Sequence, residues 1–233
     1  MALVDRVKNI LLTPKTEWPV IAGETSATAD LLKNYVAPLA AIPAIAGFIG
    51  GSLIGYSAFG VSFRTPIVAG LVAAILGYVM SFVSVFIVSF IVNALAPSFS
   101  AEKNDSMAMK VTVYSFTASW LGGVFAMIPG LRLLGVLAAL YVIFLMYLGL
   151  PRLMKCPEDK AIGYTAVVII AAIVVSVILS AIVAAVGGLG MGAAGMMGGM
   201  GSSSRSAKVE IDPNSSLGKL EGFSKKMEEA GKK

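Results

Sequence analysis

The sequence predicts an all-α polytopic membrane protein with five transmembrane helices. Five long apolar runs fill the middle of the chain, at residues 35–55, 67–95, 111–128, 133–150 and 162–186, and no charged residue interrupts their centres. A helix needs about 20 apolar residues to cross the hydrocarbon core of a bilayer, and each run reaches or nearly reaches that length. Because the runs are continuous rather than alternating, they indicate helices and exclude a transmembrane barrel.

The composition agrees with this fold class. Apolar residues make up 57% of the 233 residues and charged residues only 13%. The net charge of +5 is scattered over the loops and the two ends, where Lys and Arg set orientation beside anionic lipid. We therefore expect the lipid bilayer as the main partner and no nucleic-acid partner.

Residues 1–33 are expected to form a cytoplasmic arm that begins with an amphipathic helix. Its apolar side chains share one helical face: Leu3, Val4, Val7, Ile10 and Leu11. The polar face opposite carries Asp5, Arg6, Lys8 and Asn9. Such a helix is expected to lie in the plane of the membrane interface. It could serve as an anchor for the first span or as a docking surface for a protein partner.

Two further divisions follow along the chain. Residues 34–187 form the predicted membrane domain, and residues 188–233 form a Gly/Met-rich linker with a basic tail. Methionine sulfurs in the linker could bind Cu(I), but its glycine content favours a flexible segment. We therefore predict no metal and no cofactor.

Small residues line the first two spans. Gly47, Gly51 and Gly55 recur every fourth residue in the first span, and Gly70 and Gly77 lie in the second. Small side chains let helices approach closely in lipid. The sequence predicts that the two spans pack as a tight antiparallel hairpin, although the same strips could drive homo-oligomer formation.

Hydroxyl and amide side chains in the second and third spans form the candidate polar path or packing face: Ser81, Ser84, Asn93, Tyr114, Ser115, Thr117 and Ser119. Hydroxyls in membrane helices often bond their own backbone or a neighbouring helix. The same groups could also line a path for a neutral or weakly polar solute.

The sequence offers little for catalysis. It contains no histidine, which removes a histidine-dependent triad, relay or zinc site. No pair of carboxylates lies inside an apolar run. We therefore predict no enzyme; a lipid-directed activity would depend on the loop carboxylates Glu102, Asp105, Glu158 and Asp159.

The distribution of Lys and Arg predicts the orientation. Nine lie in the arm and the loops on its side, and two, Arg64 and Arg132, lie in the opposite short loops. The positive-inside rule then puts the amino terminus in the cytoplasm and the carboxyl terminus on the opposite side. Seven further Lys and Arg residues lie in the tail and favour the opposite orientation. The first of them, Arg205, is about 19 residues past the last span, at the edge of the range in which the rule counts charge.

Several local patterns occur in a specific order. Residues 4–11 read VDRVKNIL, 14–21 read PKTEWPVI, 93–97 read NALAP, 147–151 read YLGLP and 160–165 read KAIGYT. Together they resemble the Yip1 family, in its bacterial inner-membrane branch, over about residues 3–186. The family-pattern residues are Trp18, Pro38, Pro97, Trp120, Pro129, Pro151, Lys155, Pro157, Lys160 and Tyr164.

The resemblance implies five spans, a cytosolic amino terminus and a location in the cell inner (plasma) membrane. Eukaryotic members of the family act in vesicle traffic and associate with Rab-type GTPases. We expect a non-enzymatic protein that organises or shapes the membrane, or recruits a partner at its cytoplasmic face. The alternative is a small transporter or channel between the second and third spans.

Overall fold

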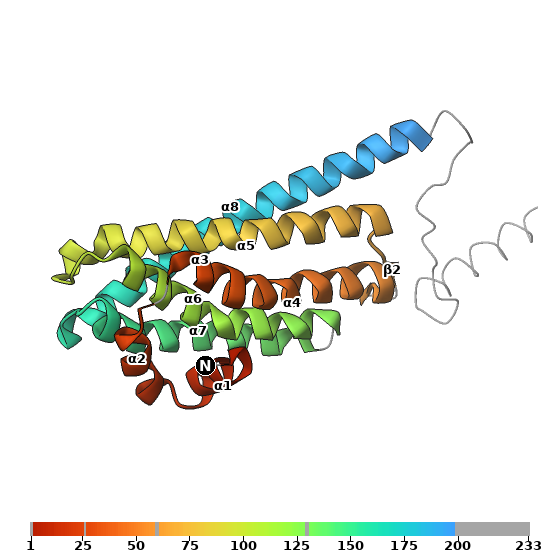
Figure 1. The fold of residues 1–233 in the computed structure, drawn as a ribbon. Helices are drawn as coiled ribbons and strands as arrows, with labels where there is room; N and C mark the ends of the chain where they lie inside the picture. The colour runs from red at the N-terminus through yellow and green to blue at the C-terminus, as the bar shows by residue number, and fades with distance from the viewer. Residues whose placement is uncertain (1, 26, 59–60, 129–130, 199–233) are drawn as a thin grey trace, which may run out of the picture.

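The computed structural model describes residues 2–25, 27–58, 61–128 and 131–198. Long helices run back and forth along the molecule and lie side by side (Figure 1). They are α4 (Ala37–Phe48), α5 (Ile67–Leu95), α6 (Asp105–Gly122), α7 (Arg132–Leu153) and α8 (Glu158–Gly198). The predicted helical architecture is therefore confirmed, and residues 199–233 of the predicted linker and tail lie outside the described residues.

The first long helix is built from four segments that follow one another directly. The short helix α3 (Thr28–Leu31) leads into the π-helical turn η1 (Leu32–Val36), then α4, then the π-helical turn η2 (Ile49–Ile54). Pro38 and Pro43 both lie within α4. Each lacks the backbone N–H that would bond the preceding turn, so this helix departs from regular geometry.

The connections between helices are short. Strands β1 (Tyr56–Ala58) and β2 (Val61–Phe63) pair antiparallel between η2 and α5, with Tyr56 opposite Phe63. At its other end α5 passes into the 3-10 turn η3 (Ala96–Phe99), which holds Pro97. The Asn104 side chain then accepts a hydrogen bond from the Met107 N–H at 3.1 Å and caps the start of α6.

Helix α6 lies at the centre of the bundle. Twelve of its 18 residues are buried, and α4, α5 and α7 pack against it. The 3-10 turn η4 (Gly123–Met127) extends α6 and packs against α4. In contrast, α8 exposes large apolar side chains such as Ile170 and Val177. The most polar helix is thus the one that its neighbours cover, which keeps most of its hydroxyl groups away from lipid.

Within the part of the chain that the structure describes, four segments are long and apolar enough to cross a membrane: Thr28–Ile54, Ile67–Phe99, Leu133–Leu153 and Glu158–Val186. The predicted run at 111–128 is not among them, because its residues belong to the polar helix α6 and to η4. A membrane protein with several spans is confirmed, and the count of five stays a prediction.

The arm folds back onto the bundle. Helix α1 (Leu3–Leu12) contacts α6, and α2 (Pro14–Gly23) contacts α7. Ile10 is fully buried, whereas Val4 and Leu12 are 73% and 70% exposed. Arg6, expected on the outward polar face, is only 5% exposed, so that expectation was wrong. The pattern of one helix could not reveal the carboxylates that α2 brings to Arg6.

Candidate functional site

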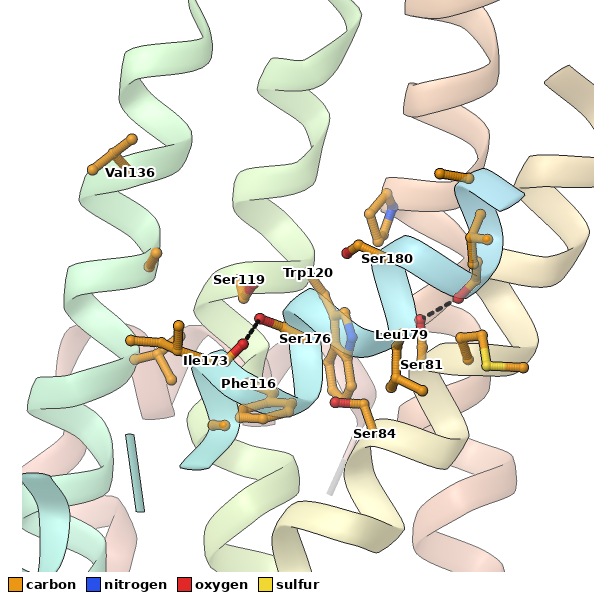
Figure 2. A pocket seen from close by; sticks show the side chains of 18 of the residues that line it. Ser81, Ser84, Phe116, Ser119, Trp120, Val136, Ile173, Ser176, Leu179 and Ser180 are labelled. Carbon is orange, nitrogen blue, oxygen red and sulfur yellow. Dashed lines mark hydrogen bonds between the residues drawn. The ribbon is translucent and has the colours of Figure 1, made fainter. Parts of the chain in front are cut away.

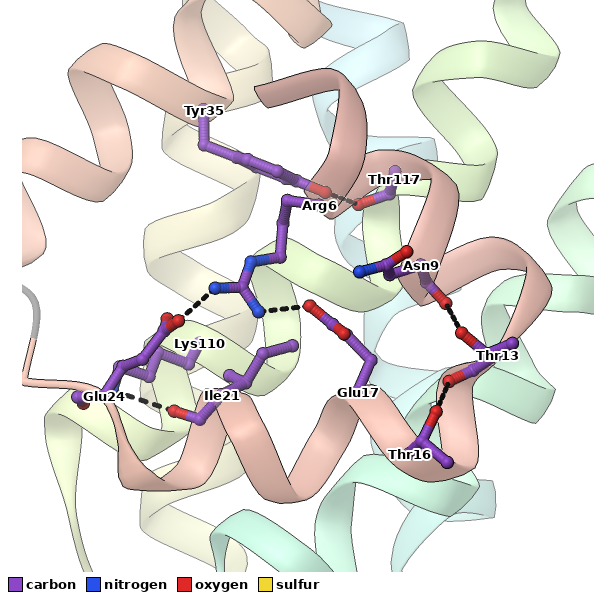
Figure 3. A network of polar contacts seen from close by, with 10 residues as sticks. All are labelled: Arg6, Asn9, Thr13, Thr16, Glu17, Ile21, Glu24, Tyr35, Lys110 and Thr117. Carbon is purple, nitrogen blue, oxygen red and sulfur yellow. Dashed lines mark hydrogen bonds and ion pairs between the residues drawn. The ribbon is translucent and has the colours of Figure 1, made fainter. Parts of the chain in front are cut away.

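A buried ion-pair network joins the arm to the bundle (Figure 3). The Arg6 guanidinium donates hydrogen bonds to the carboxylates of Glu17 and Glu24, both carried by the chain that follows α1. The Arg6 and Glu17 side chains are each 6% exposed. The guanidinium also lies over the Tyr114 ring, 5.7 Å from its centroid, which adds a cation–π contact with α6.

Lys110 of α6 completes the network. Its ammonium group donates to the carbonyl oxygen of Ile21 at 3.3 Å and to that of Glu24. These carbonyls lie at the end of α2, where a helix leaves its last acceptors without intrahelical partners and favours a cation. Burial lowers the pKa of Lys110, and the charge of Glu24 opposes that change.

The charges around Arg6 raise its pKa by more than burial lowers it. Burial by itself lowers the pKa of Arg6, but the hydrogen bond to Glu24 and the neighbouring charges raise it, and the net direction is upward. Arg6 therefore stays charged, and the carboxylates that face it have a permanent partner. We call this arrangement the clasp. It consists of Arg6, Glu17, Glu24 and Lys110, and it holds α1, α2 and α6 together.

Aromatic rings surround the clasp. Trp18 is fully buried and contacts the edge of the Tyr114 ring at 6.4 Å between centroids. Tyr35 meets the same ring at 4.8 Å, and its hydroxyl shares a hydrogen bond of 2.9 Å with the Thr117 hydroxyl. Two members of the predicted polar path, Tyr114 and Thr117, therefore belong to this cluster.

A second feature is a groove of about 920 Å³ beside α8, which diverges from its neighbours (Figures 1 and 2). Its walls come from α5, α6, α7 and α8. Three residues of the predicted path line it: Ser81, Ser84 and Ser119. Ser176 and Ser180 of α8 also line it, and the sequence did not single them out.

The groove is mostly apolar, although serines contribute to it. Ser81 donates to the Gly77 carbonyl at 2.9 Å, and Ser176 donates to the Ile173 carbonyl at 2.8 Å. These hydroxyls are satisfied within their own helices. The Trp120 ring also lines the groove, and it contacts the edge of Phe116 at 6.2 Å between centroids.

The remaining members of the predicted path lie elsewhere. Ser115 is fully buried, and its hydroxyl has no hydrogen-bond partner in the part of the chain that the structure describes. Asn93 lies near the end of α5, where it donates to Asp105 and accepts from the Asn104 N–H at 2.9 Å. The structure thus distributes the seven residues over a groove, a buried cluster and a loop.

The small-residue strips of α4 and α5 are tight at some positions and open at others. A Cβ atom added to Gly70 would lie 1.9 Å from the Ser52 hydroxyl, which indicates close packing there. A Cβ atom added to Gly47 or Gly77 would meet nothing within 4 Å. A cavity of about 360 Å³ lies between the two helices at these positions and shares Gly77 and Ser81 with the groove.

Several family-pattern residues meet at the end of the bundle where α5 passes into η3 and α7 into the loop before α8. Lys155 pairs with Glu102 at 2.9 Å, and Lys160 donates to the Ser100 hydroxyl at 2.7 Å. The Tyr164 hydroxyl donates to the Val92 carbonyl, and its ring stacks on Phe99. Pro97 lies in η3, Pro151 lies inside α7 and Pro157 directly precedes α8. Pro129 lies outside the described residues.

Sequence reasoning missed the clasp. Its one available sign was the presence of oppositely charged residues, Arg6 and Glu17, on two short helices joined at Thr13-Pro14. Among the residues described, no group of three or more His, Cys, Asp or Glu could hold a metal ion. The methionines considered for copper lie beyond the side chains that the structure describes.

Comparison with known proteins identifies the family. The Yip1 domain matches residues 8–180, which include the clasp partners Glu17, Glu24 and Lys110 and most of the groove. No curated protein and no solved structure matches the chain. Because the match spans most of the chain, from the arm to α8, the protein belongs to the Yip1 domain family.

Proposed function

We propose that this membrane protein is non-enzymatic and recruits a protein partner through its docked arm. The observation that supports this role best is the buried clasp, in which Arg6 holds Glu17 and Glu24 while Lys110 holds the end of α2. A segment that only anchored the chain in the interface would not need buried charges, which are costly unless paired.

The clasp gives the arm a fixed outer surface. Apolar Val4 and Leu12 are exposed on it, and so are the charged side chains of Asp5, Lys8 and Lys15. A surface already ordered before binding avoids much of the entropic cost of association. An apolar centre with a polar rim is the usual arrangement of a protein interface.

The proposed location is the bacterial inner membrane, with the arm in the cytoplasm. The excess of Lys and Arg on the arm's side supports the orientation. The resemblance to the bacterial branch of the family supports a location in the inner membrane. Whether a second copy of the chain takes part is an outcome of the experiment below.

Site-specific photocrosslinking in living cells tests this role. A photoreactive amino acid replaces Val4 or Leu12, and the matched control replaces Ile75, an outward residue of α5 that is 56% exposed. We expect a protein adduct from the two arm positions and lipid adducts from Ile75. An adduct of twice the chain mass would identify a second copy as the partner. Lipid adducts alone from Val4 and Leu12 would show that the arm is an anchor and reject recruitment.

The groove supports a second candidate, a small transporter or channel for a neutral or weakly polar solute. Ser81, Ser84 and Ser119 from α5 and α6 line the same space, as a path between the second and third spans requires. Flux in proteoliposomes should fall in Ser84→Leu and Ser119→Leu variants. Equal flux in both variants and the unmodified protein would reject this lining.

A further inference from the structure

We propose that the groove between α5, α7 and α8 binds one acyl chain of an anionic phospholipid, whose phosphate lies at Arg64. The proposal concerns the groove alone and does not depend on the recruiting role. It is supported by the position and shape of the groove, by the hydrogen bonds of its serines and by the positive charge of Arg64.

The position of the groove restricts what can enter it. Its walls come mainly from Ile67–Phe99, Leu133–Leu153 and Glu158–Val186, which are long and apolar enough to cross a membrane, and Pro43 of Thr28–Ile54 also lines it. Side chains such as Met80, Leu140 and Ile173 line it. At the depth of the hydrocarbon core, the surrounding solvent is acyl chains. An open apolar groove at that depth is filled by lipid unless another helix covers it.

The shape of the groove favours an acyl chain over a helix. A second empty volume, the cavity between α4 and α5, adjoins the groove at Gly77, because both volumes are lined by Ala73, Gly77 and Ser81. A helix with its side chains is about 10–12 Å wide and cannot follow a gap left by missing glycine side chains. A flexible hydrocarbon chain can follow such a gap. The volume of about 920 Å³ also falls within the range of about 300–1,000 Å³ that is usual for ligand pockets.

Two of the five serines that line the groove have a hydrogen-bond partner within their own helix. Ser81 and Ser176 each donate to a carbonyl of their own helix, as Figure 2 shows. A serine that is satisfied in this way behaves as a small side chain towards the groove. The lining therefore suits methylene groups better than a polar solute.

Arg64 supplies charge complementarity at one end of the groove. It directly precedes Thr65, which lines both empty volumes, and its side chain is exposed. Its Nε atom donates to the Ile54 carbonyl at 3.4 Å, and no carboxylate pairs with it in the described ranges. The sequence contains no Asp or Glu at residues 31–101 or 106–157. The guanidinium is therefore available to a phosphate, which it can bind through two parallel hydrogen bonds.

Native mass spectrometry of the full chain, released from nanodiscs of phosphatidylglycerol and phosphatidylcholine, tests the proposal. We expect one retained phospholipid per chain, with phosphatidylglycerol preferred. In Gly77→Leu the new side chain extends into open space, since a Cβ atom at this position meets nothing within 4 Å. Excluding two methylene groups should lower retention about tenfold. Gly77→Ala should retain most of the lipid.

Two matched variants separate the groove from the general lipid shell. Ile75→Phe adds similar bulk to the outward face of the same helix and should leave retention unchanged. Arg64→Gln should lower the preference for phosphatidylglycerol about fivefold without abolishing retention. Absence of retained lipid, or equal retention in Gly77→Leu and the unmodified protein, would overturn the proposal. Equal loss in Ile75→Phe and Gly77→Leu would assign the lipid to the outer shell and also overturn it.

A fluorescence measurement checks the same site in the bilayer. Trp120 lines the groove but is only 6% exposed, and Trp18 is fully buried beneath the arm. Brominated acyl chains quench tryptophan on contact. We expect saturable quenching that Gly77→Leu weakens strongly and Ile75→Phe leaves intact. Quenching of equal extent in Gly77→Leu would contradict an acyl chain beside Trp120.

Discussion

At the residue scale, Arg6 decides how the arm is held. A single buried cation contacts two carboxylates and an aromatic ring, so three elements depend on one side chain. Buried ion pairs stabilise little relative to apolar groups of the same shape, but removal of one partner is strongly destabilising. The position of Arg6 on the polar face of α1 predicted an exposed side chain. That prediction was wrong because the periodicity of one helix does not reveal the charges on the next helix.

Substitution of Arg6 should therefore be severe. Arg6→Ala leaves the Glu17 carboxylate buried without its partner, and we expect a loss of about 3–5 kcal/mol in the free energy of unfolding. Lys8→Ala, at an exposed position of the same helix, should change it by less than about 0.5 kcal/mol. Denaturation in detergent micelles measures both.

A double variant distinguishes the ion pair from the packing around it. Arg6→Met combined with Glu17→Leu removes both charges and keeps comparable volume, and it should recover most of the stability lost in Arg6→Ala. If the double variant were as unstable as Arg6→Ala, the loss would come from packing and not from an unpaired carboxylate.

The reactivity of Cys156 reports on the loop between α7 and α8. Burial raises the pKa of its thiol, the charge of Asp159 acts in the same direction, and Lys160 opposes them. Because the thiolate is the reactive form, alkylation of the folded protein should be slow at pH 8 and should continue to rise at a pH where an exposed thiol has reached its plateau. A maleimide time course at several pH values checks this. Rates equal to those of the denatured chain would show that Cys156 is exposed.

At the element scale, the sequence predicted the long helices well where the apolar pattern was unbroken. The second run, predicted at 67–95, is helix α5 from Ile67 to Leu95. The π-helical turns that flank α4 were not predictable, because they arise from how prolines and glycines fit against neighbours. The tight hairpin between the first two spans was predicted from small residues alone, and the structure distinguishes which of them touch a neighbour.

Neighbouring glycines of the first long helix should respond differently to substitution. A Cβ atom at Gly50 would lie 2.3 Å from the Ala126 backbone oxygen, which cannot rotate away, so Gly50→Ala should cost about 1–3 kcal/mol. Gly47→Ala lies one turn earlier in open space and should be neutral, or stabilising by up to about 1 kcal/mol through helix propensity. Thermal unfolding of the two variants in one detergent checks the difference. Equal melting temperatures would contradict the contact between η2 and η4.

At the scale of the whole molecule, the sides of the bundle differ. The arm packs along α6 and α7, where the clasp and the aromatic cluster are buried. On the groove side, α8 diverges from its neighbours (Figure 1). Local sequence patterns predicted the candidate sites only in part. Ser81, Ser84 and Ser119 were identified by their polarity, but the separation of Ser115 and Asn93 from them depends on how α6 is surrounded, which no local pattern records.

The path of α6 determines the number of spans. If α6 and η4 cross the membrane, the loops on either side of them face opposite compartments, as the predicted count of five requires. In a Cys156→Ser background, a membrane-impermeant maleimide should label Leu131→Cys but not Lys103→Cys on intact spheroplasts. Both positions are exposed. Labelling of both, or of neither, would reject a crossing by α6.

The central claim is that the arm is part of the folded protein and not a mobile tether. Hydrogen–deuterium exchange of the full chain in nanodiscs tests it most directly. We expect the amides of α1 and α2 to be protected together with those of α6, and to lose that protection in Arg6→Ala while α6 keeps it. Exchange of residues 3–23 at the rate of a free peptide in the unmodified protein would contradict the docked arm and the recruiting surface that depends on it.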